Sequence, residues 1–322
     1  QAVSPTSPEA LPRAEVLEEG DRIRLSTPSL QGSVSLRGGR IDDLTLVNYR
    51  ETIEPESPEV VLLSPTRTAN PYYGVWGWIP AQGAQTGPTP GANTDWQVER
   101  GGALTPDNPI TLRWDNGAGL IFRRTIAVDE RYLFTVTQSV ENTTGNEVSL
   151  VPYGIVARHG APETIGFWIL HEGGIASADG TLTLLDYDEI SDLETDPVEG
   201  APAQRIGVDA NGWLGFTDKY WLAAMAGGAE RSFTGVFKSV PTAGGPVFQS
   251  DLRQNPVTVG PGERADTDSL FFAGAKDMSV LSSYERNPGI ADLTNAVDWG
   301  WFFFLTRPLF TALMFIYGVV GN

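Results

Sequence analysis

Apolar and polar residues alternate along most of this chain, beginning near Asp21. In residues 131–141, Tyr132, Phe134 and Val136 occupy one set of alternate positions, while threonine and serine occupy the other. Successive side chains of a strand point to opposite faces, so this pattern predicts a strand with one buried face and one solvated face.

Similar segments follow one another, with short turn sequences between them. We expect strands at residues 120–128, 131–141, 147–159, 166–171, 181–185, 220–225, 233–240 and 268–273. No helical pattern alternates with these strands, which argues against parallel βαβ units. The sequence therefore predicts an all-β fold, an antiparallel sandwich.

The C-terminal part of the chain has a different pattern. Residues 279–286 have the composition of a short helix, and residues 299–322 are apolar and aromatic. The pair Arg307-Pro308 divides this last stretch into halves shorter than the roughly 20 residues that a spanning helix needs. Its aromatic residues suit the lipid headgroup level, which favours a helix lying at the membrane surface. A kinked transmembrane span and a buried core helix are the alternatives.

Two other stretches are expected to be irregular. Residues 72–95 are rich in glycine and proline and contain Trp76 and Trp78, which would form either a plug over the core or the wall of a groove. Residues 186–199 contain seven acidic residues and no lysine or arginine, which predicts a solvated, mobile loop. A calcium loop is the alternative there, although the EF-hand spacing is absent.

Composition excludes several functions. A net charge of −18 opposes binding to nucleic acid, and membrane contact has to come from a local apolar segment. With no cysteine and two histidines, the chain has no disulfide framework, no thiolate site and no histidine-rich metal site. Residues 1–20 lack the basic and apolar regions of a signal peptide, and their prolines predict an extended linker.

Candidate catalytic and binding residues are few. His159, Glu163, His171 and Glu172 could form an acid/base set acting on a sugar, but the preferred interpretation is that the two histidines are solvent-facing residues, one at the end of a strand and one beside a turn. A nucleophile elbow and a phosphate-binding loop are absent from the sequence. The aromatic residues near Gly212 are interpreted as core, with a partner-binding patch as the alternative.

The C-terminal residues carry a resemblance to a known family. Leu293-Thr294, Val297-Asp298-Trp299-Gly300-Trp301, Arg307-Pro308-Leu309-Phe310 and Val320-Gly321-Asn322 resemble the segment before the second transmembrane helix of the YidC membrane protein insertases. Weaker motifs agree in order, namely Arg37-Gly38-Gly39, Asn211-Gly212-Trp213, Tyr220-Trp221, and Pro261-Gly262 before Leu270-Phe271-Phe272. The resemblance covers nearly all of the chain, from Asp21 to Asn322.

The resemblance implies a domain organisation. Residues 1–20 would be a flexible linker after a removed transmembrane helix, and residues 21–275 a periplasmic β-supersandwich similar to galactose mutarotases. Residues 276–298 would be a short helical connector, and residues 299–322 an interfacial amphipathic helix. The protein would lie on the periplasmic side of the Gram-negative inner membrane.

The resemblance also implies a non-enzymatic function, with no catalytic residue, cofactor or metal. The domain would assist the insertion and folding of nascent inner-membrane proteins with the SecDF and SecYEG subunits of the Sec translocon. Alone it would lack insertase activity, because the family's membrane groove lies in the transmembrane bundle after Asn322. A carbohydrate-binding or mutarotase-like periplasmic protein and a largely structural spacer are the alternative hypotheses.

The implied site residues fall into two groups. Gly212, Trp213, Tyr220 and Trp221 would form a SecF contact. The membrane-interface residues would be Trp299, Trp301, Phe302, Phe303, Phe304, Arg307, Pro308 and Phe310, with the guanidinium of Arg307 reaching lipid phosphate.

Overall fold

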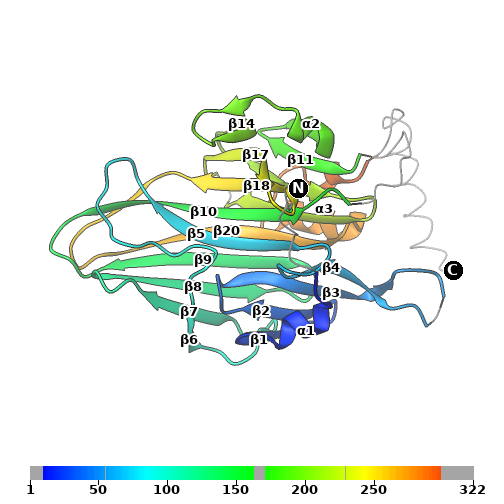
Figure 1. The fold of residues 1–322 in the computed structure, drawn as a ribbon, viewed down its shortest axis with the longest axis horizontal. Coiled ribbons are helices and arrows are strands. Elements are labelled where there is room, and N and C mark those ends of the chain that lie inside the picture. Colours follow the sequence, from blue (N-terminus) through cyan, green and yellow to red (C-terminus); the bar gives the residue numbers. More distant parts are fainter. Residues whose placement is uncertain (1–9, 55, 163–170, 229, 299–322) are drawn as a thin grey trace, which may run out of the picture.

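Two antiparallel sheets packed face to face make up most of this protein (Figure 1). The computed structural model describes residues 10–54, 56–162, 171–228 and 230–298. Each pair of neighbouring strands within the two sheets is antiparallel, as the alternating pattern predicts. The fold is therefore all-β.

The first sheet has eleven strands. In spatial order they are β1 (Arg22–Ser26), β2 (Leu30–Ser35), β3 (Arg40–Arg50), β5 (Tyr72–Pro80), β10 (Val148–His159), β18 (Gly245–Gln254), β17 (Phe233–Thr242), β14 (Ala201–Val208) and β13 (Thr195–Asp196), with β4 (Glu59–Leu63) beside β3 and β19 (Val257–Val259) beside β10.

The second sheet has nine strands. In spatial order they are β12 (Thr181–Asp186), β11 (Gly173–Ala178), β15 (Gly212–Thr217), β16 (Trp221–Gly227), β20 (Arg264–Ala275), β9 (Leu133–Asn142), β8 (Leu120–Val128), β7 (Ile110–Asp115) and β6 (Gln97–Arg100). The predicted strand at residues 120–128 has the same bounds as β8, and those at 181–185 and 233–240 match β12 and β17 closely.

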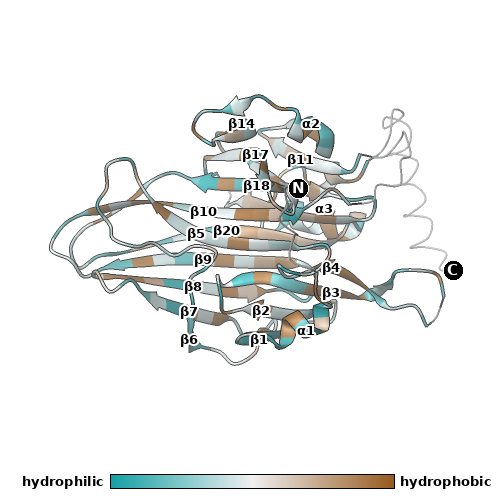
Figure 2. Ribbon diagram, viewed as in Figure 1, coloured by the Kyte–Doolittle hydropathy of each residue, from teal (hydrophilic) through white to brown (hydrophobic). Residues whose placement is uncertain are grey.

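The core lies between the two sheets, where apolar residues recur along the strands (Figure 2). Trp76 of the first sheet packs edge-on against Phe271 of the second, with ring centroids 5.5 Å apart. Its indole nitrogen donates to the Ser269 hydroxyl at 3.0 Å, and Trp78 packs against Phe122 at 6.2 Å. Trp76 and Trp78 therefore join the two layers, and neither lines a groove.

The expectation of an irregular loop over residues 72–95 was wrong for its first part, because residues 72–80 form strand β5. The glycines that suggested a loop instead make room for large side chains. A Cβ on Gly77 would lie 2.4 Å from the Tyr153 hydroxyl, and one on Gly154 would lie 3.0 Å from the Trp76 ring.

In the part of the chain that the structure describes, four short helices border the sheets. They are α1 (Arg13–Glu18), α2 (Tyr187–Ser191), α3 (Met278–Arg286) and the 3-10 helix η1 (Leu293–Ala296). Within the residue ranges that the structure describes, no helix is long and apolar enough to cross a membrane. Residues 13–18, expected to be extended, form α1, in which Val16 is buried and Arg13 pairs with Asp43.

The acidic segment at residues 186–199 is solvated at five of its seven acidic residues, but it is not a loop throughout, because it contains α2 and β13. Tyr187 and Ile190 of α2 are buried, and the side chain of Glu199 is 3% exposed. Burial alone would raise the pKa of Glu199, but hydrogen bonds and ion pairs with Arg253 and Lys238 hold it below its ordinary value. The segment has no lysine or arginine of its own, and the cations that pair with Glu199 come from β17 and β18, which are distant in sequence.

Helix α3 confirms the helix expected at residues 279–286. Asp277 caps its N-terminus by accepting hydrogen bonds from the backbone N–H groups of Ser279 and Val280. Tyr284 faces the second sheet, where its hydroxyl donates to Asp129 at 2.5 Å and its ring packs against Phe272. The helix is thereby fixed on the outer face of this sheet.

Arg124 occupies a core position of β8, where an apolar residue would be expected. It is fully buried, and its guanidinium donates to the carbonyl oxygens of Gly38, Gly39 and Trp76 at 2.8, 3.0 and 2.5 Å. Its guanidinium also lies over the Trp96 ring at 4.6 Å, and burial lowers its pKa to about 9. Arg124 of the second sheet thus binds two parts of the first sheet, namely strand β5 and the turn between β2 and β3.

We predict that Arg124→Ala lowers the free energy of unfolding by about 3 kcal/mol or more, because it leaves buried carbonyl groups without donors and opens a cavity. Arg113→Ala, which removes a partly exposed ion pair with Asp115, should cost about 1 kcal/mol or less. Urea unfolding followed by tryptophan fluorescence measures both. Equal losses for the two variants would contradict the role assigned to Arg124.

Candidate functional site

A pocket of about 530 Å³ lies at the end of the sandwich where the described chain finishes. We call it the exit pocket, and its lining includes Tyr49, Lys219, Tyr220, Trp221, Lys276 and Asp298. Tyr49 comes from β3, Trp221 begins β16, and Lys276 follows β20. The β3–β4 hairpin and α3 lie at this same end of the sheets (Figure 1).

Three aromatic rings form one wall of the exit pocket. Tyr49 packs edge-on against Trp221 with ring centroids 5.1 Å apart, and Tyr220 packs against Trp221 at 6.0 Å. The Lys219 ammonium lies 4.9 Å from the centre of the Tyr220 ring. Tyr220 is 56% exposed, so the pocket presents an aromatic surface with cations nearby.

Two charged residues of the exit pocket, Lys276 and Asp298, are fixed by hydrogen bonds. The Lys276 ammonium donates to the Thr217 hydroxyl at 2.9 Å, and the backbone N–H of Lys276 donates to the Tyr220 carbonyl. Burial lowers the pKa of Lys276 to about 8, although Asp218 and Asp298 oppose this shift. Asp298 also accepts from the backbone N–H of His171 at 3.1 Å, which fixes the last described residue against β11.

Beside the exit pocket, an ion pair between Arg158 and Asp218 lies at the end of β10. Arg158 donates to Asp218 at 2.6 Å and to the Tyr187 hydroxyl at 3.1 Å. Its guanidinium also lies over the Tyr72 ring at 4.7 Å. The turn between β15 and β16, which carries Lys219 and Tyr220, is therefore anchored to the first sheet.

The structure brings together only part of the predicted partner-binding set. Tyr220 and Trp221 share the exit pocket, whereas Trp213 is buried and its indole donates to the Ala291 carbonyl at 3.1 Å. A Cβ on Gly212 would lie 2.7 Å from the Ser177 carbonyl, so this position supports close strand packing. The sequence did not indicate Tyr49 as part of this set, because only the fold brings the end of β3 into contact with the start of β16 in the other sheet.

The possible acid/base set does not form one site among the described residues. His159 pairs with the Tyr73 hydroxyl at 3.2 Å, and burial together with Arg40 lowers its pKa. His171 instead contacts Asp186 at 3.1 Å and the Gly174 carbonyl at 2.9 Å. Glu163 lies outside the described residues, as do residues 166–170 of the strand predicted at 166–171 and the membrane-interface residues from Trp299 onward.

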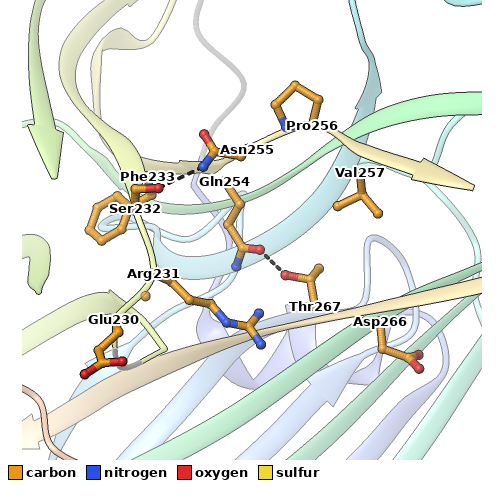
Figure 3. Close-up of a pocket in the computed structure, with 11 residues that line it drawn as sticks. Glu230, Arg231, Ser232, Phe233, Gln254, Asn255, Pro256, Val257, Asp266 and Thr267 are labelled. Atoms are coloured by element: carbon orange, nitrogen blue, oxygen red, sulfur yellow. Dashed lines mark hydrogen bonds between the residues drawn. The ribbon is translucent and has the colours of Figure 1, made fainter. Parts of the chain in front are cut away.

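A second pocket, of about 330 Å³, lies where β16, β18 and β20 meet the turns at the opposite end (Figure 3). The Arg231 side chain points toward it, and Gln254 accepts a hydrogen bond from Thr267. The Asn255 amide donates to Ser232 at 2.9 Å. Its lining is mixed, with Phe233, Pro256 and Val257 beside the polar residues, and it contains no histidine and no aligned nucleophile and base.

The described ranges also contain no cluster of three or more histidine, cysteine, aspartate or glutamate side chains able to hold a metal ion. This includes residues 186–199, where calcium binding was the alternative to a solvated loop.

Comparison with known proteins decides the family. The model of the YidC periplasmic domain matches residues 22–312. This chain belongs to that family. A membrane protein insertase YidC from Dinoroseobacter shibae is 47% identical over 323 residues, covering 100% of this chain and 53% of the relative. One from Paracoccus denitrificans is 43% identical over 354 residues, covering 100% of this chain and 55% of the relative. The chain thus spans about half the length of these relatives.

Among solved structures, a galactose mutarotase related enzyme from Lactobacillus acidophilus is similar over 79% of this chain and 97% of its own. The TM-score is 0.49 and the sequence identity is 11%.

We predict that Lys276 titrates near pH 8 in the folded protein, below its ordinary pKa of 10.5. Between these values the unfolded chain holds a proton that the folded chain has lost, so the free energy of unfolding should rise with pH. Lys276→Met should reduce this rise, to which Arg124 also contributes above about pH 9, whereas Lys219→Met, in the same pocket, should leave it unchanged. Thermal unfolding from pH 7 to 10.5 measures the effect, and an unchanged slope in Lys276→Met would contradict it.

Proposed function

We propose that this chain is the periplasmic domain of a membrane protein insertase, and that it assists the insertion and folding of inner-membrane proteins. The observation that carries the proposal is the match of the YidC periplasmic domain over residues 22–312. The domain acts without chemical catalysis, by positioning and binding. Its clients are nascent inner-membrane proteins.

The end with the exit pocket faces the bilayer in this proposal. The described part of the chain ends at Asp298, and the aromatic residues Trp299 and Trp301 follow it in the sequence. Ile53, between β3 and β4, is 99% exposed, and Tyr220 is 56% exposed at the same end. Exposed aromatic and apolar groups gather where a protein meets lipid headgroups, which supports this orientation.

Residues 299–322 are proposed to lie at the membrane surface as an amphipathic helix. Its aromatic residues supply apolar burial, and Arg307 reaches lipid phosphate. The chain as a whole carries a net charge of −18, which repels an anionic surface. Membrane contact is therefore local, and the sandwich is held above the bilayer rather than spread over it.

Subunits of the Sec translocon, SecDF and SecYEG, are the proposed protein partners. Tyr220 and Trp221 are the best-placed contact residues, because they form an aromatic surface beside Lys219. Trp213 and Gly212 lie at the other end of β15, where Trp213 pairs with Ala226, so they contribute only indirectly, by holding β15 in the sheet.

An insertion assay in cells tests the function. Cells depleted of their own insertase would produce a whole insertase carrying this domain, and insertion of a reporter membrane protein would be followed by protease protection. The expected result is restored insertion, with a smaller yield for Tyr220→Ser combined with Lys219→Ser. A whole protein that restores no insertion would contradict the proposal.

We predict that replacing Trp301, Phe303 and Phe304 with serine abolishes flotation of this chain with liposomes, because it removes the apolar surface that enters the interface. Val198→Ser is the matched control, since Val198 is 74% exposed and lies far from the C-terminal segment in sequence. Flotation on a density gradient measures binding. If the triple variant floats like the unmodified chain, the membrane anchor lies elsewhere.

A further inference from the structure

Most sheet edges of this protein are protected against pairing with another strand. Strand β1 is covered by the chain at Leu104. The Ser26 N–H donates to the Leu104 carbonyl at 3.0 Å, and the Leu104 N–H donates to the Arg24 carbonyl at 2.8 Å. Strand β13 has two residues, and β6 carries Glu99 and Arg100 with a shift in register. Short strands, charges and bulges are the means by which proteins blunt edges.

Strand β12, at the other end of the second sheet from β6, lacks these protections. Its sequence is Thr-Leu-Thr-Leu-Leu-Asp, and it pairs with β11 over six residues without a register shift. It contains no proline, lysine or bulge. Among the strands described, β11 is its one neighbour, so its outer side is an open edge.

The turn before β12 decides which backbone groups point outward. Asp179 and Gly180 both have positive φ, at 48° and 85°, and connect Ala178 to Thr181 as a two-residue hairpin turn. In such a hairpin the residues flanking the turn form a hydrogen-bonded pair, and alternate residues direct their N–H and C=O groups away. Leu182 and Leu184 therefore present unpaired backbone groups to an incoming strand.

The side chains of these two leucines enlarge the same surface. Leu182 is 41% exposed and Leu184 is 44% exposed, and both lie on one face of β12. Ser177 and Ile175, the residues of β11 that pair with Leu182 and Leu184, are buried. The apolar face of the sheet thus continues uncovered to its edge.

Charge selects among possible occupants of this edge. Asp179 lies before β12, and Asp186, Asp188 and Glu189 lie at its end. Backbone N–H groups of residues 209–211 bind the Asp179 carboxylate and lower its pKa, which keeps it ionised. Antiparallel pairing of two copies would bring Asp186 of one near Asp179 of the other, which disfavours self-association.

We propose that β12 is a strand-addition site for an extended polypeptide segment of another protein, with apolar residues at alternate positions and lysine or arginine at its ends. Backbone groups of Leu182 and Leu184 supply the hydrogen bonds, and their side chains select apolar neighbours. The flanking carboxylates select the basic ends. The inference goes beyond the proposed function, because strand addition requires neither the membrane nor the exit pocket.

The test uses a fluorescent heptapeptide, Lys-Thr-Val-Thr-Val-Thr-Lys with blocked termini, and measures its anisotropy with the 322-residue chain. Saturable binding is expected. Leu184→Pro removes an outward N–H without breaking a bond to β11, and it should weaken binding at least about fivefold. Leu184→Lys, which keeps the backbone intact, should weaken binding through repulsion of the basic peptide.

Val98→Lys is the matched control, because Val98 is 43% exposed on β6 at the opposite edge of the same sheet and should leave binding unchanged. Circular dichroism confirms that each variant is folded. Peptides N-methylated at alternate residues should bind in one methylation register and fail in the other.

Three results would overturn the proposal. They are the absence of saturable binding, equal weakening by Val98→Lys, and a dimer of the chain that Leu184→Pro dissociates, which would identify a second copy as the occupant. Because the insertion assay uses the whole protein in cells, loss of peptide binding in vitro can be distinguished from failure of the proposed function.

Discussion

The packing of aromatic side chains between the two sheets is the constraint on which the rest of this structure depends. Each sheet buries one face against the other sheet, so its inward side chains have to interdigitate with those of the facing sheet. Trp76 meets Phe271 and Trp78 meets Phe122 across this layer. Glycines at positions 74, 77 and 154 leave the space that these rings and Tyr153 occupy.

The same layer explains the buried arginine. Arg124 lies in the inward set of β8, and three backbone carbonyl groups bind its guanidinium in place of a carboxylate. A Cβ on Gly39 would lie 2.5 Å from that guanidinium, and φ there is +57°. The Arg37-Gly38-Gly39 motif is therefore a packing feature of the turn it forms.

Packing of the layers also separates the surfaces available for function. Because the long strands run nearly side by side, their turns gather at two ends (Figure 1). One end carries the exit pocket and the start of the proposed membrane anchor, and the other carries the pocket of Figure 3. The C-terminal end of the β12 edge is connected to the exit pocket, because Asp186 contacts His171, whose backbone N–H donates to Asp298.

The sequence by itself determined the all-β class, the bounds of β8 and the position of α3, because alternation and segment composition are local signals. It indicated Tyr220 and Trp221 as an aromatic pair. Only the tertiary structure decided that Tyr49 joins them, that Trp213 is buried and that residues 72–80 form a strand. It also placed Glu199 among cations from β17 and β18. Pairings between residues distant in sequence leave no periodic signal, and whether a glycine makes a turn or makes room depends on the side chain facing it.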